Sequence, residues 1–283
     1  MPAYNAARTL SSTLRSVLEQ QTEHDFEVVV LDNASTDGTG DIAAAAGDPR
    51  VRVVRNDAVL AIGDNWNKAV SLATGELIKV VCADDTLLPG CLAEQSRIMD
   101  NAEIAITATR FEVIDEDDAV LETGLGLPGL LGRRAARELI RTIVRDGPAE
   151  FGPTAAAMFR RAHFDAVGGF RGDLVFPMDV DLFARVGVFG QFHGSPMVGA
   201  AWRNSRFNLC SRTSTRSKLT DMLRFHHRLA RSHRAYLTRT DVAAADLRLA
   251  AAALNRLRIR ALRLEPRPAK PASSPNTSDL TTA

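Results

Sequence analysis

Residues 26–39 read FEVVVLDNASTDGT, and this stretch decides the fold class. Its first six residues form an apolar, β-branched run that is typical of a buried strand. Similar runs recur at residues 51–54 and 77–82, and helix-like stretches separate them at residues 39–46 and 63–73. Strands that alternate with helices at this spacing indicate βαβ units. We therefore expect an α/β protein with a mostly parallel sheet flanked by helices.

The chain divides by composition into three parts. Residues 1–215 contain all the expected strands, so they form the α/β domain. Residues 216–264 are rich in Arg, Leu and Ala and predict two basic helices that extend this domain at its C-terminal end. Residues 265–283 are rich in Pro, Ser and Thr and offer no apolar surface to bury, which predicts a disordered tail.

Composition excludes several classes of protein. The 283 residues are 45% hydrophobic and 24% charged, which is ordinary for a globular chain and excludes disorder throughout, collagen and coiled coils. No apolar run approaches the ~20 residues that cross a bilayer. The net charge of +1 conceals an asymmetry, because residues 1–202 carry −11 and residues 203–283 carry +12. The basic part is either a solvated helical surface packed on an acidic domain or a contact for anionic lipid; we expect no nucleic-acid partner.

The chain has three cysteines, Cys82, Cys91 and Cys210, and they show no metal-ligand spacing. Their odd number favours a reducing compartment, so we expect a cytoplasmic protein, peripheral to the inner face of the membrane if the basic helices dock there. We expect Cys82 to pack as a small buried hydrophobe.

Acidic side chains follow two of the expected strands. Asp32 and Asn33 follow the first, and Asp84 and Asp85 follow the strand at residues 77–82. Open parallel sheets bind ligands beyond the carboxyl ends of their strands, so both groups belong at one edge. Carboxylate oxygens suit Mg²⁺ or Mn²⁺, which often bridge to phosphates. The alternative is that Asp84 and Asp85 only cap the helix that follows them.

Five motifs occur in an order that resembles one enzyme family. The chain resembles the inverting family-2 glycosyltransferases, whose catalytic domain has the GT-A fold, over roughly residues 1–215. The motifs are PAYN at 2–5, DNASTDGT at 32–39, ADD at 83–85, VGGF at 167–170 followed by MDVDL at 178–182, and AWR at 201–203.

The resemblance implies a binding site for a nucleotide-diphospho-sugar donor, with UDP as the expected nucleotide. Ala3 and Tyr4 would line the base pocket, where Tyr4 could stack on the base. Asp32 and Asn33 would face the base and the ribose, and the side-chain carbonyl of Asn33 could accept a hydrogen bond from the base. Arg203 would reach the diphosphate.

The resemblance also implies a metal and a catalytic base. Asp84 would hold the ribose or the metal, and Asp85 would coordinate the Mg²⁺ or Mn²⁺ that neutralises the diphosphate. Asp179 would take the proton of the acceptor hydroxyl, on a glycan, a lipid-linked or a small-molecule acceptor, and Asp181 would support that site. From the residues alone, Asp179 and Asp181 are equally explained as acids favoured at a helix N-terminus.

The sequence departs from the family pattern in three places, at Met1, at Asn33, which stands where the family often has Asp, and at Cys82. Met1 stands where the family's first strand would end, so either the true start lies upstream or that strand was lost. Its absence would leave unpaired backbone groups and a gap in the core, and we expect low stability or low activity. Cys82 stands where many members have another Asp. The alternative function is therefore a nucleotide-sugar-binding protein that has lost catalysis.

Overall fold

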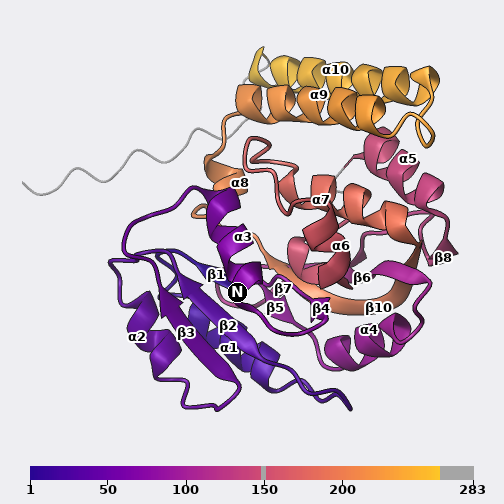
Figure 1. Cartoon of the computed structure of the whole chain (residues 1–283). Helices are drawn as coiled ribbons and strands as arrows, with labels where there is room; N and C mark the ends of the chain where they lie inside the picture. The colour runs from indigo at the N-terminus through magenta and orange to yellow at the C-terminus, as the bar shows by residue number, and fades with distance from the viewer. Residues whose placement is uncertain (148–150, 262–283) are drawn as a thin grey trace, which may run out of the picture.

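The computed structural model describes residues 1–147 and 151–261, which form an α/β structure with two sheets (Figure 1). The tail that we expect at residues 265–283 lies outside the described residues. A three-stranded sheet and a seven-stranded sheet lie side by side, and two hydrophobic clusters of buried residues stabilise them. No helix within these described ranges is both long enough and apolar enough to cross a membrane.

The first sheet is parallel throughout and has the order β1-β2-β3. It agrees with the predicted βαβ pattern, since apolar strands alternate with helices whose buried faces cover them. Leu10, Leu14 and Val17 form the buried face of the first helix at helical spacing. The elements are β1 (Pro2–Ala3), α1 (Leu10–Leu18), β2 (Val28–Asp32), α2 (Thr39–Ala44), β3 (Val51–Arg55) and α3 (Ile62–Leu72).

The second sheet is mixed, so the expectation of a mostly parallel sheet is wrong for this half of the protein. Its order is β4-β9-β6-β10-β5, with β7 paired to β6 and β8 paired to β10. Only the β6–β10 pair is parallel, and the other described pairs are antiparallel. The strands are β4 (Leu77–Ile78), β5 (Thr86–Leu87), β6 (Ile104–Ile114), β7 (Val120–Leu125), β8 (Gly132–Arg134), β9 (Ala157–Arg160) and β10 (Gln191–Arg203).

The long strand β10 was not expected from the sequence, although it pairs with three other strands. Gly194, Pro196 and Gly199 interrupt its apolar pattern, and such residues usually mark turns. The ladder with β6 shifts register at three places between Gln191 and Ala200, which accommodates these residues as irregularities. Gly199 is required there, because a Cβ atom would lie 2.7 Å from Oγ1 of Thr109.

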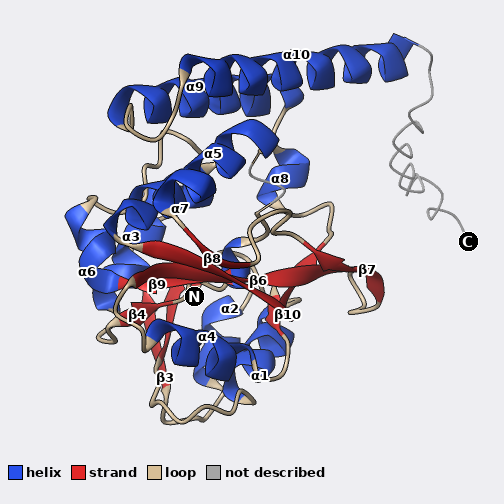
Figure 2. Cartoon of the chain, turned by 90° about the vertical axis from the view of Figure 1, so that its right-hand side faces the viewer, coloured by secondary structure: helices blue, strands red, loops and turns tan. Residues whose placement is uncertain are grey.

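The helices form layers on the second sheet (Figure 2). Helices α5 and α7 lie between the sheet and the pair α9–α10, and Phe225 and Leu229 of α9 are buried in the same cluster as Leu139 of α5. The basic helical extension is therefore packed against the domain. The helices are α4 (Cys91–Met99), α5 (Ala136–Asp146), α6 (Arg161–Ala166), α7 (Met178–Val186), α8 (Leu209–Arg212), α9 (Thr215–Ser232) and α10 (Arg239–Ala261).

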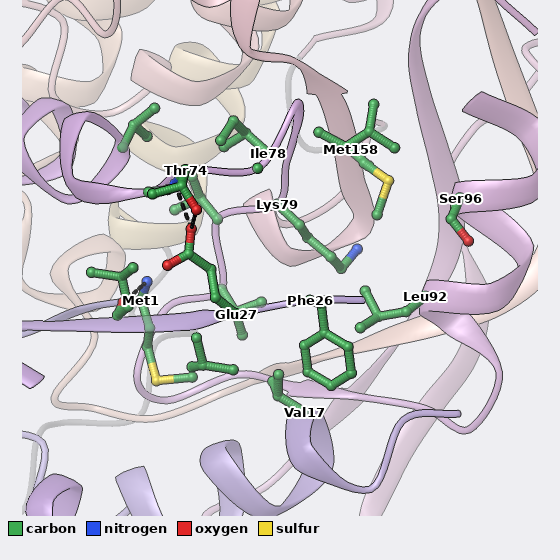
Figure 3. A pocket seen from close by; sticks show the side chains of 18 of the residues that line it. Met1, Val17, Phe26, Glu27, Thr74, Ile78, Lys79, Leu92, Ser96 and Met158 are labelled. Atoms are coloured by element: carbon green, nitrogen blue, oxygen red, sulfur yellow. Dashed lines mark hydrogen bonds between the residues drawn. The ribbon is translucent and has the colours of Figure 1, made fainter. Parts of the chain in front are cut away.

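A cavity of about 550 Å³ lies between the two sheets, lined by β2 and by residues 74–81 (Figure 3). Strand β4 ends at Ile78, although the apolar run that predicted it continues to Cys82. Beside the cavity, β1 has only two residues, and its ladder with β2 extends to the nitrogen of Met1, which donates to the Val29 carbonyl at 2.8 Å.

Candidate active site

The loop that carries Asp84 and Asp85 is held by the hydroxyl groups of Thr9, the N-cap residue of α1, and of Thr13 in its first turns. Thr9 and Thr13 both donate to the carbonyl oxygen of Ala83, at 2.8 and 3.1 Å. Because these two residues lie one helical turn apart on the same face of α1, they can reach one acceptor together. Neither threonine was predicted from the sequence, where their only signal is their spacing beside the PAYN motif.

The same loop is joined to the end of β10 through β5. Residues of β5 pair with Ala200 and Ala201, which places Arg203 directly against the acidic pair. The Arg203 N–H donates to Oδ1 of Asp85 at 3.1 Å, and its Nε donates to the Asp84 carbonyl oxygen at 2.9 Å. The guanidinium also bonds Asp115 and Asp118 in the turn after β6, so it links two acidic loops.

Asp84 and Asp85 do not cap the next helix, because α4 begins at Cys91 and its N-cap residue is Gly90. Instead, one oxygen of each carboxylate and Sγ of Cys82 lie within 4.8 Å of one another. Burial raises the pKa of Asp84. Burial, followed by the charge of Asp84, raises the pKa of Asp85 well above its usual range. A cation among these groups would stabilise their charged forms.

Asp179 lies in the first turn of α7 and carries its own set of hydrogen bonds. Its Oδ2 accepts from the Thr154 hydroxyl and its Oδ1 accepts from the Val180 N–H, each at 2.8 Å. Burial raises the pKa of Asp179, and its charge contributes to the raised pKa of Asp85. Asp179 therefore lies close enough to Asp85 for its charge to act on that carboxyl. Thr154 was not identified from the sequence, because a lone threonine in an irregular segment gives no signal.

Asp181 lies one position beyond Val180 and faces another way. It is fully buried and its Oδ2 accepts from Nε of Arg185 at 2.8 Å. Arg185 also donates to the carbonyl oxygens of Val167 and Gly169, so it ties α7 to the VGGF turn. Asp181 therefore contacts Arg185 and not Asp179. Through Arg185 it stabilises the packing of α7 against the VGGF turn.

The side chains of Asp32 and Asn33 form hydrogen bonds and an ion pair with other residues of the protein. Asp32 is fully buried, pairs with Arg55 and accepts from the Ser35 N–H. Oδ1 of Asn33 accepts hydrogen bonds from the Leu60 N–H at 2.9 Å and from Asn56 at 2.8 Å. The side-chain carbonyl oxygen of Asn33, which we expected to accept a hydrogen bond from the nucleobase, already accepts from these two N–H groups.

Ala3, Tyr4 and Asn5 lie beside this loop. Ala3 is buried in β1, and its carbonyl oxygen accepts from the Asn33 N–H at 2.8 Å. The Tyr4 side chain is exposed. Asn5 does not cap α1, which begins at Leu10; its Oδ1 accepts from the Thr36 N–H. Asn5 instead holds the PAYN segment against the DNASTDGT loop.

Comparison with known proteins identifies the class to which this fold and acidic region belong. The profile of the family described as "Glycosyl transferase family 2" matches residues 1–168, and the chain belongs to this family. The fold is accordingly of the GT-A type, as the sequence motifs implied.

Two curated relatives are similar to parts of the chain. An uncharacterized protein of Mycobacterium tuberculosis is 35% identical over 193 residues, which are 66% of this chain and 60% of the relative. The UDP-Glc:alpha-D-GlcNAc-diphosphoundecaprenol beta-1,3-glucosyltransferase WfgD of Escherichia coli is 29% identical over 120 residues, 42% of this chain and 47% of that enzyme. The chain spans about half of the length of these relatives.

Two solved structures share the fold. TarS of Staphylococcus aureus, in complex with UDP-GlcNAc, gives a TM-score of 0.67 at 16% identity and covers 93% of this chain and 74% of its own. The mannosyltransferase PcManGT of Pyrobaculum calidifontis, in complex with GDP-Man and Mn²⁺, gives 0.58 at 18% identity, with coverages of 93% and 78%. At these identities the likeness establishes the fold alone.

Proposed function

We propose that this chain is a metal-dependent, inverting glycosyltransferase that moves a sugar from a nucleotide-diphospho-sugar, a UDP-sugar, to an acceptor hydroxyl. The observation that carries the proposal is the group formed by Cys82, Asp84 and Asp85, together with the effect of the Asp179 charge on the pKa of Asp85. TarS, with a similar fold, binds UDP-GlcNAc, which supports a UDP-linked donor here.

A divalent cation, Mg²⁺ or Mn²⁺, fits the residues around Asp85. A cation bonded at about 2.1–2.3 Å keeps opposite ligand atoms within about 4.5 Å, close to the 4.8 Å limit of the group formed by Cys82, Asp84 and Asp85. When bound, the cation would neutralise charge on the leaving diphosphate. The Mn²⁺ in the PcManGT complex supports this assignment.

Asp179 would act as the general base for the acceptor hydroxyl. The hydroxyl must lose its proton as its oxygen attacks the anomeric carbon, and the bond from that carbon to the diphosphate breaks in the same displacement. Thr154 and the Val180 N–H hold the carboxylate in one orientation. A single displacement inverts the configuration of the anomeric carbon.

Donor assignments near the N-terminus follow from the same proposal. We assign Ala3 and Tyr4 to the wall of the base pocket. The side chains of Asp32 and Asn33 are hydrogen-bonded within the protein. They would therefore hold the loop after β2 in shape, and other groups of that loop would contact the base and the ribose. We assign Arg203 to the contact with the diphosphate. To bind a phosphate oxygen, its guanidinium would have to release the exposed Asp118 carboxylate.

The Asp179→Asn variant tests directly whether the chain catalyses sugar transfer. We expect it to lose transfer while its affinity for the nucleoside diphosphate, measured calorimetrically with Mn²⁺, is unchanged. Asp165→Asn is the matched control, because Asp165 is exposed on α6. If the wild type binds a nucleoside diphosphate but transfers sugar neither to water nor to any acceptor of a broad panel, the chain is a nucleotide-sugar-binding protein instead.

The outer helix layer suggests a place for the acceptor. Exposed arginines on α9 and α10 lie near exposed leucines, including Leu247 and Leu254 of α10, which are 71% and 66% exposed. Basic groups with exposed apolar side chains favour anionic membrane surfaces. We propose that these helices dock at the cytoplasmic face of a membrane carrying a lipid-linked acceptor, as the lipid substrate named for WfgD suggests. Flotation with anionic vesicles at low and high salt tests this proposal. If no salt-sensitive binding is observed, the proposal is wrong.

A further inference from the structure

Cys82 occupies an unusual environment for a cysteine that follows an apolar run. Its neighbours Val81 and Ala83 are both buried within a hydrophobic cluster, as is Cys91. Cys82 is only partly buried, and its Sγ lies with the carboxylate oxygens of Asp84 and Asp85. Cys82 therefore does not pack as the fully buried small hydrophobe that we expected, whereas Cys91 is fully buried.

The chemistry of these three groups differs from that of a purely acidic cluster. Carboxylates are hard ligands and suit Mg²⁺, which prefers six oxygen ligands in near-ideal octahedral geometry. A thiolate is a soft ligand and favours softer or later transition metals. Sγ of Cys82 lies within 4.8 Å of a carboxylate oxygen of both Asp84 and Asp85, and a cysteine must lose its proton to bind a cation.

We propose that Cys82 is the third protein ligand of the cation and that it shifts the preference of the site from Mg²⁺ toward Mn²⁺, Zn²⁺ and Cd²⁺. This inference rests on the proposed metal site at Asp84 and Asp85. On coordination the Sγ–H bond breaks, the proton leaves to solvent and the sulfur donates an electron pair to the cation. The oxidation states do not change.

Cadmium provides a readout that does not depend on activity, because a thiolate bound to Cd²⁺ absorbs in the ultraviolet by charge transfer. Titration of the full chain with Cd²⁺ should develop this absorption. The Cys82→Ser variant should lack it, whereas the Cys210→Ser control should retain it. In calorimetry, the ratio of Mn²⁺ to Mg²⁺ affinity should fall roughly tenfold or more in Cys82→Ser, and Cys82→Asp should bind Mg²⁺ more tightly than the wild type.

The outcomes separate this inference from the proposed metal site. If Mn²⁺ binds the wild type and Cys82→Ser equally, and the Cd²⁺ absorption persists without Cys82, the ligand assignment is overturned while the carboxylate site stands. If neither Mn²⁺ nor Cd²⁺ binds the wild type, or if Asp85→Ala leaves the affinity for both unchanged, the metal site itself fails. Circular dichroism of each variant checks that the fold is retained.

Discussion

The backbone N–H of Arg203 donates to Oδ1 of Asp85 at 3.1 Å, across 118 positions of sequence. The end of β10 therefore holds the carboxylate that we assign to the cation. The Arg203 side chain is 2% exposed and reinforces this contact through the Asp84 carbonyl oxygen and through Asp115 and Asp118 in the next turn. Arg203 is thus a structural link as well as the proposed diphosphate contact.

Truncation of this side chain should be costly. Arg203→Ala removes a buried guanidinium and leaves carbonyl oxygens without a donor, so we expect the free energy of unfolding to fall by about 3 kcal/mol. Donor affinity should fall with it. Arg206→Ala is the control, because Arg206 is an exposed arginine three residues after Arg203, and this change should alter stability little. Urea unfolding curves of equal midpoint for the wild type and Arg203→Ala would contradict this assignment.

The hydroxyl of Thr154 should set the activity of the proposed base. Thr154→Val keeps the side-chain volume but removes the donor to Oδ2 of Asp179, so the charged carboxylate loses a stabilising bond and the pKa of Asp179 rises. We expect kcat to fall roughly 10–100-fold, within the range of general-base contributions. The acidic limb of the pH–rate profile should move to higher pH.

A conservative substitution separates this effect from a packing effect. Thr154→Ser keeps the hydroxyl and loses only a methyl group, so it should restore most of the rate and the original position of the acidic limb. If Thr154→Val and Thr154→Ser have the same pH profile, the hydroxyl does not act on Asp179.

Without metal, the contribution of Asp84, Asp85 and Asp179 to stability should decrease with rising pH in the acidic range. The raised pKa values of Asp84, Asp85 and Asp179 mean that the folded state binds protons more tightly than the unfolded state, whose carboxyls titrate near 3.8. Between that value and the raised values, the unfolded state holds fewer protons, so the free energy of unfolding falls as pH rises. The loss is complete above the raised pKa values.

Metal and mutation should both reduce this pH dependence. Mn²⁺ at neutral pH should stabilise the folded state by binding its charged carboxylates, and a chelator should reverse the gain. Asp85→Asn removes the most strongly perturbed carboxyl, so its unfolding free energy should vary less with pH than that of the wild type. Thermal melts across acidic to neutral pH, with and without Mn²⁺, measure both effects. An identical pH dependence in Asp85→Asn would contradict the assigned pKa direction.

The sequence predicted the parts of the fold whose pattern is local. Continuous apolar runs identified β2 and β3, and the helix-like stretches between the expected strands identified α2 and α3. Strand β10 could not be found in this way, because its pairing compensates for Gly194, Pro196 and Gly199 and no local pattern records that pairing.

The candidate site divides in the same manner. Asp84, Asp85 and Asp179 could be selected because acidic residues follow a strand or begin a helix in recognisable motifs. Their supports could not. Thr9 and Thr13 act on a carbonyl some 70 positions away, and Thr154 acts on a carboxylate 25 positions away. Such partners depend on tertiary placement, which the sequence does not encode at any fixed spacing.

The cavity between the sheets should accept an added strand. The nitrogen of Met1 already donates to the Val29 carbonyl, so residues joined before Met1 would continue the parallel ladder along β2 and enter a cavity lined by Val28, Val80 and Leu92. Each large apolar side chain buried there contributes roughly 1.5–3 kcal/mol. An N-terminal extension of five Val and Ile residues should therefore raise the melting temperature by several degrees. An extension of five Gly and Ser residues is the matched control, since it adds the same chain length without apolar surface. Equal melting temperatures for the two extended chains would show that the cavity does not take a strand.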